Sequence, residues 1–489
     1  MSQSPTSASA QYGPVRAQIF EALRSAILSG QIAPGARLPS TRTLANTYGV
    51  SRNTVMSAFD QLRAEGFCEA RKGAGTFVTK NFGALAPGIK PPVVDTRTHE
   101  PTTNDSGLSR RGRAIAKAPR MPIPPVTGGG NQHALQIGVP ALDVFPFQQW
   151  NTIRNQGNRH RDWRRLGYND PRGIYELREQ VCRHVAVARG IRCSPEQVVI
   201  TAGSQQAIDL CCRILLDPGT PAWLEDPGYL GTRAALIASG AYIVPVPVDE
   251  RGLDVAEGIR RSPQAAAAFV TPSTQFPLTV TMDLDRRIAL VNWAHDTGSW
   301  IVEDDYDCDF LYKGRQLSAL QTLDNGNRVI YIGTFSKTMY PALRLGYIIA
   351  PIPLIDALIA AHLATDIHLP ITDQYALAEF IRSGKFSRHV VKMRNIYSQR
   401  QKHVYSLLDQ KPRLRAREMP RGGLHLLGWL PAGSNDEDVA AAAQHAGINT
   451  WALSTHCLDN RLPPALLLSF NSPQDLTTKA LASIAHLIG

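Results

Sequence analysis

Apolar residues recur at helical spacing through the N-terminal part of the chain. They predict helices over 14–30, 41–48 and 52–65, and the last two are separated only by Gly49-Val50-Ser51. Glycine permits a sharp turn at that point, and the Ser51 hydroxyl can cap the helix that follows. A hairpin with a basic, glycine-rich tip is predicted over 67–78. Together these elements predict a helix-turn-helix followed by a wing.

Apolar strand-like runs alternate with helical patterns from about residue 131 to the C-terminus. This alternation is typical of an α/β domain. Two later runs, at 422–426 and 465–470, predict the strands of a smaller subdomain over about 370–489. Residues 81–130 are rich in Pro, Gly, Thr and Ser and show no sustained period, which is typical of a linker. The predicted organisation is a small domain over 1–80, a flexible basic linker over 81–130 and a large domain over 131–489.

The chain has 489 residues, and its formal net charge of +11 is concentrated near the N-terminus. Residues 1–80 contribute +5 and residues 81–130 contribute +4. A basic surface at one end of a chain indicates a polyanion partner, and the helix-turn-helix pattern makes double-stranded DNA the expected one. For the cluster Arg110-Arg111-Gly112-Arg113 in the linker, a solvated charge run is favoured over contact with phosphates.

Composition favours a cytoplasmic protein with no membrane segment and no metal site. The first residues show no basic stretch followed by an apolar run, and no part of the chain stays apolar and uncharged for ~20 residues. The seven cysteines are scattered without Cys-x-x-Cys spacing. This pattern argues against a disulfide framework and against a zinc site.

A lysine lies in a small, hydroxyl-rich turn, Gly333-Thr334-Phe335-Ser336-Lys337, directly after a strand-like run. Another stretch, 300–307, begins as an apolar strand and ends in carboxylates, the first of which is Glu303 and the second Asp304. Sheets of this class place ligands at the ends of parallel strands. Pyridoxal 5'-phosphate needs a lysine for its aldehyde, a carboxylate for its ring nitrogen, and hydroxyls with a cation for its phosphate. The candidates for these roles are Lys337, Asp304, Ser336 and Arg344.

A second small-residue turn opens a helix at Ser204. The strand-like run 198–201 leads into Ala202-Gly203-Ser204-Gln205, and the N-terminus of a helix offers free backbone N–H groups to an anion. Such a turn alone is usually only a turn. Combined with Lys337 and Arg344, it predicts that Ser204 and Gln205 cradle the phosphate.

With these motifs the chain resembles the MocR-type (GabR-like) members of the GntR regulator family, which join a winged helix-turn-helix to a fold-type I aminotransferase-like domain. The resemblance implies an α+β DNA-binding domain and a pyridoxal-phosphate domain with a large, mostly parallel sheet and a small α+β subdomain. It also implies roles for single residues. Lys337 would form the internal aldimine. Asp304 would pair with the ring nitrogen, and Arg344 would bind the phosphate. Tyr306 and Gln275 would serve the ring hydroxyl, and Tyr229 would stack on the ring.

The N-terminal motifs resemble the GntR-type winged helix through Leu38-Pro39-Ser40-Thr41-Arg42, Val50-Ser51-Arg52-Asn53-Thr54-Val55 and Gly73-Ala74-Gly75-Thr76-Phe77-Val78. The first residues of a recognition helix reach base edges and phosphates in the major groove. The resemblance therefore implies DNA contacts from Arg42, Arg52 and Thr54, with Ser51, Asn53 and Gly75 behind them.

Two departures from the family pattern bear on substrate handling. Within the loop Pro272-Ser273-Thr274-Gln275-Phe276-Pro277-Leu278-Thr279, Thr274 replaces a histidine, Leu278 a threonine and Thr279 a glycine. Leu467 occupies the position where aminotransferases carry an arginine for a substrate carboxylate, so no carboxylate clamp is visible. His425 is favoured as a core or pocket-wall residue over a catalyst.

The leading hypothesis is a transcriptional regulator that holds pyridoxal phosphate on Lys337 and senses an amine, an amino acid or the cofactor itself. The alternative is a catalytically active aminotransferase with an accessory DNA-binding domain, at most weakly active. A third reading is a dimerisation module that never loads cofactor. The resemblance further implies a homodimer with swapped arms that reads two half-sites.

Overall fold

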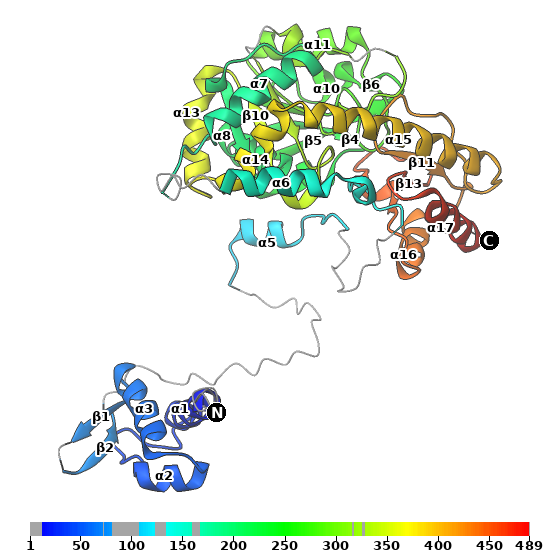
Figure 1. Cartoon of the computed structure of the whole chain (residues 1–489). Coiled ribbons are helices and arrows are strands. Elements are labelled where there is room, and N and C mark those ends of the chain that lie inside the picture. Colours follow the sequence, from blue (N-terminus) through cyan, green and yellow to red (C-terminus); the bar gives the residue numbers. More distant parts are fainter. Residues whose placement is uncertain are drawn as a thin grey trace, which may run out of the picture. The chain divides into compact units, whose positions relative to one another are not determined.

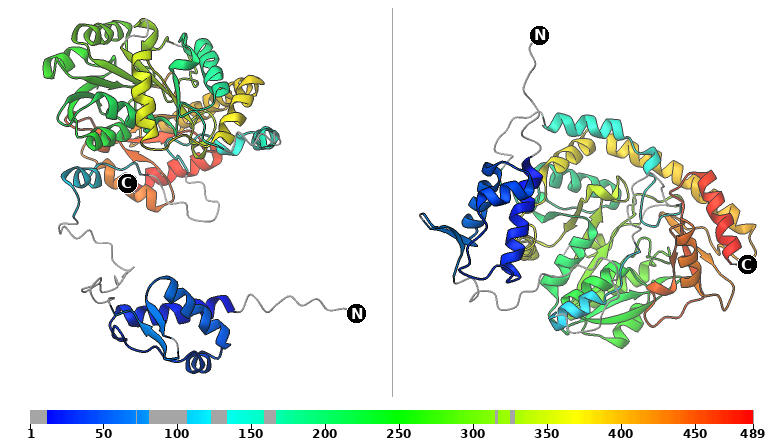
Figure 2. Two further views of the ribbon diagram at one scale, coloured as in Figure 1. Left: turned by 90° about the vertical axis from the view of Figure 1, so that its left-hand side faces the viewer. Right: turned by 90° about the horizontal axis from the view of Figure 1, so that it is seen from below.

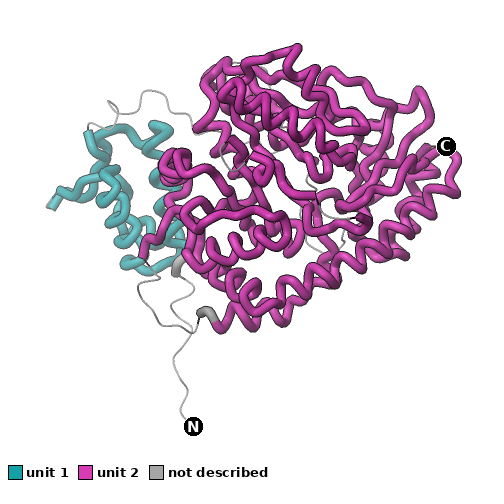
Figure 3. The backbone as a smooth tube through the Cα atoms, turned by 90° about the horizontal axis from the view of Figure 1, so that it is seen from above, with its two compact units in different colours: residues 1–104 teal, residues 105–489 magenta. Residues whose placement is uncertain are grey.

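The computed structural model (Figure 1) describes residues 12–71, 73–80, 107–122, 134–158, 167–314, 317–324 and 328–488. The chain divides into two compact units, residues 1–104 and 105–489 (Figure 3). None of the described helices is both long and apolar enough to cross a membrane.

The N-terminal unit is a three-helix domain with a two-stranded wing, as predicted. Its elements are α1 (Tyr12–Leu28), α2 (Thr41–Tyr48), α3 (Arg52–Ala64), β1 (Cys68–Arg71) and β2 (Gly75–Val78). The Ser51 hydroxyl accepts a hydrogen bond from the Thr54 backbone N–H at 3.3 Å and so caps α3. Gly49 adopts the left-handed conformation with φ 63°, which ends α2 and turns the chain into α3. A buried cluster that includes Ile19, Leu23 and Val55 holds the helices together.

The second unit is built on an eight-stranded sheet in the order β3-β10-β9-β8-β7-β4-β5-β6. The five central strands, from β9 to β5, are parallel, whereas β10 is antiparallel to both of its neighbours and β6 is antiparallel to β5. The strand bounds are β3 (Val198–Thr201), β4 (Pro221–Asp226), β5 (Tyr242–Asp249), β6 (Gly252–Leu253), β7 (Ala267–Val270), β8 (Trp300–Asp304), β9 (Val329–Thr334) and β10 (Gly346–Ile349).

Helices cover both faces of this sheet (Figures 1 and 2). Because successive strand residues point to opposite faces, Val199 and Ile330 pack toward one helical layer while Ile200 and Tyr331 pack toward the other. The first layer consists of α8 (Ser204–Leu215), α9 (Leu230–Ser239) and α13 (Ile352–Leu363). The second contains α7 (Tyr175–Arg189), α10 (Val255–Arg261), α11 (Leu284–Thr297) and α14 (Ile371–Arg382). The bounds of two further helices are α6 (Phe147–Asn158) and α12 (Leu320–Leu323).

A smaller three-stranded sheet in the order β11-β13-β12 forms the core of the C-terminal subdomain. Its elements are β11 (His425–Trp429), α16 (Asp436–His445), β12 (Trp451–Ala452), β13 (Ala465–Ser469) and α17 (Gln474–Leu487). The long helix α15 (Lys385–Asp409) links the two cores, since Phe386 packs in the large one and Val404 in the small one. The helix α14 packs with the large core, whereas Ala134 and Leu135, far earlier in the chain, pack with the small one.

Residues 107–122, which the sequence pattern assigns to the irregular linker, contain a helix and pack on the second unit. Helix α5 (Arg110–Ala116) is capped by the Ser109 hydroxyl, which accepts from the Gly112 N–H at 3.0 Å. The Arg111 guanidinium donates to the carbonyl of Ala238 in α9 at 2.5 Å. The prediction of an unpatterned linker was wrong for this segment, because its seven-residue helix is too short to show a period and is held by tertiary contacts.

Candidate functional site

The strand ends bring the predicted chemistry to one edge of the large sheet. Asp304 is the last residue of β8, and Lys337 lies in the turn that follows β9. Since β10 runs antiparallel to both β9 and β3, the strand β3 points in the same direction as β9. The N-terminus of α8, at Ser204, therefore lies at the same edge as the lysine.

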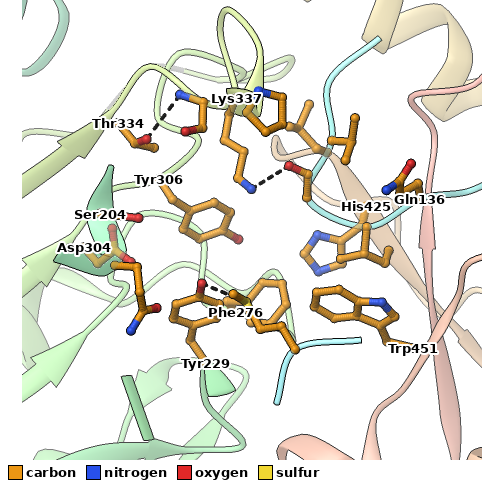
Figure 4. A pocket seen from close by; sticks show the side chains of 18 of the residues that line it. Gln136, Ser204, Tyr229, Phe276, Asp304, Tyr306, Thr334, Lys337, His425 and Trp451 are labelled. Atoms are coloured by element: carbon orange, nitrogen blue, oxygen red, sulfur yellow. Dashed lines mark hydrogen bonds between the residues drawn. The ribbon is translucent and has the colours of Figure 1, made fainter. Parts of the chain in front are cut away.

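A cavity of about 240 Å³ opens at this edge (Figure 4). Eight of the nine predicted cofactor residues line it, namely Ser204, Gln205, Tyr229, Asp304, Tyr306, Ser336, Lys337 and Arg344. Its other lining residues include Thr271, Thr334, Gln136, Gly138, Phe276, His425 and Trp451. The ninth predicted cofactor residue, Gln275, does not line the cavity.

The Lys337 amine lies inside the cavity and donates a hydrogen bond to the Gly138 carbonyl at 2.7 Å. Burial lowers the pKa of Lys337, and the nearby Arg344 guanidinium acts in the same direction. The carboxylates of Asp304 and Asp307 oppose this effect but do not cancel it. A lowered pKa increases the fraction of unprotonated amine, which is the form that attacks an aldehyde.

Asp304 is a buried carboxyl group that forms no ion pair or hydrogen bond with the residues that the structure describes. Its side chain is 8% exposed, and Oδ1 makes no hydrogen bond with any described residue. Burial, and then the charge of Asp305, raise the pKa of Asp304 to about 7, although Lys337 acts in the opposite direction. A cationic N–H donor placed in the cavity would complete this carboxylate and bring its pKa down again.

Close glycine packing assembles an anion cradle at the other end of the cavity. Gly203 precedes α8 with φ 85°, and a Cβ added to Gly346 would come within 2.9 Å of the Gly203 Cα. This approach brings Arg344 beside the start of α8, where its guanidinium donates to the Ala202 carbonyl. The free N–H groups of the first helical turn and the Arg344 charge together suit a phosphate.

Two tyrosines complete the polar side of the cavity. Burial, and then neighbouring carboxylates of which Asp307 is the strongest, raise the pKa of Tyr306 well above its ordinary value, so its hydroxyl keeps its proton. That hydroxyl makes no well-formed hydrogen bond with a described residue. The Tyr229 hydroxyl donates to the Met121 sulfur at 3.0 Å, and the Tyr229 ring meets the edge of Phe276 at 5.8 Å.

The prediction for Gln275 was wrong in its placement. Its amide is 1% exposed and fully used, because Nε2 donates to the Pro227 and Phe276 carbonyls at 2.8 and 2.7 Å and Oε1 accepts from the Leu278 N–H at 3.0 Å. Gln275 therefore shapes the loop after β7 and leaves no group for a ligand. Thr271 lines the cavity in its stead, and its hydroxyl donates to the buried Glu225 at 2.6 Å.

Residues from distant segments close the cavity on the side away from Asp304. Trp451 comes from β12, Phe276 from the loop after β7, and Gln136 from the segment before α6. No local pattern marks these positions as functional, since each is an ordinary apolar or polar residue in its own segment. His425, expected in the core or the pocket wall, lines the cavity, and its Nε2–H donates to the Pro277 carbonyl at 3.0 Å.

Leu467 lies in the middle of the small sheet and is fully buried. It pairs with Leu427 on one side and Trp451 on the other, and belongs to the apolar cluster behind the cavity wall. The position without an arginine is thus filled by packing and offers no charge to a carboxylate.

In the N-terminal unit, α2 and α3 present three of the predicted DNA contacts. Arg42, Arg52 and Asn53 are exposed and make no hydrogen bond or ion pair with the described residues. Thr54 was expected among the first contacts, but its side chain is buried and its hydroxyl hydrogen-bonds that of Ser51 at 3.0 Å. Its role is therefore to hold the start of α3.

The wing adds a further basic residue that sequence reasoning missed. Gly75 has φ 112°, and a Cβ there would come within 2.8 Å of the Arg37 guanidinium. Arg37 also forms a bridge with Phe77 of the wing strand and is exposed. Gly75 thus allows Arg37 to lie against the wing, where the sequence placed only Arg71 and Lys72.

Comparison with known families agrees with both units. Residues 15–78 match the bacterial regulatory proteins of the gntR family, and residues 134–470 match aminotransferase class I and II. The chain is 36% identical to the probable rhizopine catabolism regulatory protein MocR of Rhizobium meliloti, over 88% of this chain and 82% of that protein. The chain belongs to the MocR-type regulators of the GntR family.

Other members of this family align over almost the whole chain. The regulator TauR of Rhodobacter capsulatus is 32% identical over 89% of this chain and 88% of its own length. The pyridoxine biosynthesis regulator PdxR of Corynebacterium glutamicum is 29% identical over 96% and 95%. The predicted joining of a GntR-type DNA-binding domain to an aminotransferase-like domain is confirmed.

Solved structures match the second unit and confirm its predicted fold. An archaeal alanine:glyoxylate aminotransferase superposes with a TM-score of 0.68 at 27% identity, over 73% of this chain and 91% of that protein. The α-aminoadipate aminotransferase LysN of Thermus thermophilus was solved with a phosphopyridoxyl-leucine. It superposes with a TM-score of 0.67 at 26% identity, over 73% of this chain and 92% of that protein. The unpartnered Asp304 carboxylate, the buried Lys337 amine and the Arg344 cradle fit pyridoxal 5'-phosphate.

Proposed function

We propose that this chain is a DNA-binding transcriptional regulator that carries pyridoxal 5'-phosphate on Lys337 and responds to an amine or amino-acid ligand, or to the cofactor itself. The observation that supports it best is the convergence of Lys337, Asp304 and Arg344 on one cavity, in a chain whose other unit is a GntR-type winged helix. We further propose a cytoplasmic homodimer, with DNA-binding arms swapped between subunits and two half-sites read together.

Each cavity residue has a separate task in this proposal. The cofactor supplies an aldehyde that condenses reversibly with primary amines. Asp304 would hold the ring nitrogen in its protonated form, because a buried carboxylate oxygen that accepts no hydrogen bond from a described residue is stabilised by a cationic donor. The first turn of α8 and Arg344 would bind the phosphate, which would fix the position of the ring within the cavity.

Tyr306 and Lys337 act on the reactive side of the ring. The Tyr306 hydroxyl keeps its proton and can therefore donate a hydrogen bond to the ring oxygen. Lys337 would hold the cofactor through its aldehyde, and its lowered pKa increases the fraction of unprotonated amine available for that bond. A ligand that displaces this amine can shift the regulator between two states only if it binds those states with different affinity.

DNA recognition is assigned to Arg42, Arg52 and Asn53, with Arg37 beside the wing. Arginine and asparagine side chains at the start of a recognition helix can read guanine and adenine edges. The other basic side chains on the surface contact phosphates. Alanine at Arg52 is expected to relax sequence preference, whereas alanine at Arg37 is expected to weaken binding to all sequences alike.

The deciding experiment measures binding to the chain's own upstream DNA at fixed salt, with and without pyridoxal phosphate, for the wild type and Lys337→Ala. A footprint or affinity that changes with cofactor in the wild type but not in the variant supports the proposal. Salt is held constant because phosphate contacts make protein–DNA affinity depend steeply on it. If wild-type binding ignores the cofactor, the sensing role is refuted. Absence of the visible absorbance of lysine-bound cofactor from wild-type protein would favour a module that never loads it.

A second candidate function is amino-group transfer by the second unit. It is favoured by the presence in one cavity of a lysine, a carboxylate and residues suited to bind a phosphate. It is opposed by the fused DNA-binding domain and by the buried Leu467, which gives a substrate carboxylate no arginine. Amino exchange with an amino acid by a protein that binds no specific DNA would replace the regulator proposal.

A further inference from the structure

The cavity has two chemically different sides (Figure 4). Ser204 and Asp304 lie on one side, the labelled His425 and Trp451 lie on the other, and the Lys337 side chain reaches in between them. The first side holds the groups that the cofactor requires. The second side faces the space left for the non-reacting part of a ligand. It is lined by the polar Gln136 together with Ile137, Phe276, Leu424, His425 and Trp451.

This second side is a packed, oriented aromatic wall. The Trp451 indole N–H donates to the Asn449 side-chain oxygen at 3.0 Å, and its ring stacks on His456 with an interplanar angle of 19°. Phe276 meets Trp451 edge to face at 6.5 Å. Leu467 packs behind these rings in the same apolar cluster. The rings therefore present a fixed apolar surface to the cavity.

The described lining residues contain two cations, and both are engaged away from this wall. Lys337 donates to the Gly138 carbonyl at 2.7 Å, and its nitrogen is the group that the cofactor takes up. Arg344 lies at the start of α8 and donates to the Ala202 carbonyl. His425 adds no charge, because its Nε2–H is spent on the Pro277 carbonyl and burial lowers its pKa to about 4.

We infer that the ligand of this site is a primary amine whose remaining part is uncharged and apolar, with an arylalkylamine as the best-fitting class. The inference rests on the proposed function, since the amine must reach a cofactor held at Lys337. The aromatic wall gains contact area and edge-to-face packing with such a ligand. An α-carboxylate would leave water at a wall where the described lining residues offer no cation to pair with it, which is unfavourable.

The test uses two ligands that differ only in the carboxylate. 2-Phenylethylamine and L-phenylalanine are titrated into the full-length, cofactor-loaded chain by calorimetry, and the same ligands are added to operator-binding assays. The amine is expected to bind at least about tenfold more tightly, because the carboxylate loses water without gaining a partner. Only the amine is expected to change operator affinity.

Variants locate the effect at the wall. Trp451→Ala is expected to weaken the binding of 2-phenylethylamine by about tenfold. Trp451→Phe is expected to recover much of the lost affinity, because an aromatic face remains. Trp300→Ala is the matched control, since Trp300 lies at the start of β8, at the opposite end of that strand from Asp304, has Arg328 over its ring and does not line the cavity. Its affinity for the amine is expected to equal that of the wild type.

The outcomes separate this inference from the function on which it rests. L-Phenylalanine binding as tightly as the amine, or a loaded protein that binds neither ligand, would overturn the ligand class while leaving a cofactor-responsive regulator intact. A Trp451→Ala variant that keeps cofactor and full amine affinity would overturn the role of the wall. A wild type that retains no cofactor on Lys337 would refute the proposed function, and the inference would fall with it.

Discussion

The buried ion pair between Arg189 and Asp305, directly after Asp304 in the chain, allows a quantitative prediction. Arg189, the last residue of α7, places Nε 2.6 Å from Oδ2 of Asp305, and the two side chains are 2% and 1% exposed. Asp305 also accepts the Tyr331 hydroxyl at 2.8 Å. Arg189 donates in addition to the Leu317 carbonyl at 2.7 Å and to the Ser273 hydroxyl at 2.6 Å. The pair is thus closed off from water, and Asp305 Oδ1 has no hydrogen-bond partner among the described residues.

The substitution Arg189→Met retains most of the apolar stem but removes the charge. Asp305 then remains buried as an uncompensated carboxylate directly after Asp304. Breaking a buried pair by removing one partner costs about 3–5 kcal/mol, far more than the pair itself contributes relative to an apolar replacement. The double variant Arg189→Met/Asp305→Asn removes both charges and is expected to recover part of that loss.

Urea denaturation followed by tryptophan fluorescence measures this cost in the second unit alone. All seven tryptophans of the chain lie between positions 150 and 451, so the signal does not report on the DNA-binding unit. Arg251→Met is the matched control, because Arg251 pairs with Asp283 and Asp285 at the surface with 53% of its side chain exposed. Its denaturation midpoint is expected to stay near that of the wild type.

The reasoning is refuted if Arg189→Met lowers the free energy of unfolding by less than about 1 kcal/mol, the range of exposed pairs. A double variant no more stable than the single one would also contradict it, because the cost would then come from lost packing and not from an unpaired charge.

Three further predictions concern single groups. Ser51→Ala removes the cap of α3 and should destabilise the N-terminal unit by about 1 kcal/mol, while Ser51→Asn restores it; equal melting curves by circular dichroism would contradict this. Asp304→Asn should weaken cofactor retention by about tenfold or more in equilibrium dialysis, and unchanged retention would argue against its pairing with the ring nitrogen. Burial lowers the pKa of His456 to about 4, so the wild type should lose stability relative to His456→Phe as pH falls from about 6.5 to about 4, because unfolding takes up a proton; parallel urea midpoints across that window would exclude the effect.

Contacts between residues close in the chain allowed the N-terminal helices and the strand-end residues of the site to be predicted from the sequence. The helices of the N-terminal unit follow from apolar spacing, from the caps at Ser40 and Ser51 and from the turn at Gly49, and the structure keeps the predicted bounds closely. The lysine turn and the carboxylates of β8 stand at strand ends, so their meeting at one sheet edge follows from the rule for parallel sheets. These features depend on contacts within a few residues or on one topological rule.

What the sequence left open depends on segments far apart in the chain. Gln275 carries the amide expected of a ring partner, yet its loop folds so that neighbouring carbonyls consume that amide. Thr54 has the chemistry of a DNA contact, but packing turns it toward Ser51. Both side chains have local partners in competition with a ligand, and only the tertiary arrangement decides between them.

The sequence by itself determined the two-unit organisation, the family, the cofactor chemistry and most of the predicted residues that line the cavity. The tertiary structure alone decided the shape of the ligand space, where Ile137, Phe276, His425 and Trp451 meet from four separate segments, and it brought Met121 from the supposed linker to Tyr229. The reason is physical: reactive groups such as Lys337 need particular neighbours and so leave a local pattern, whereas an apolar wall can be made from any segments that pack together.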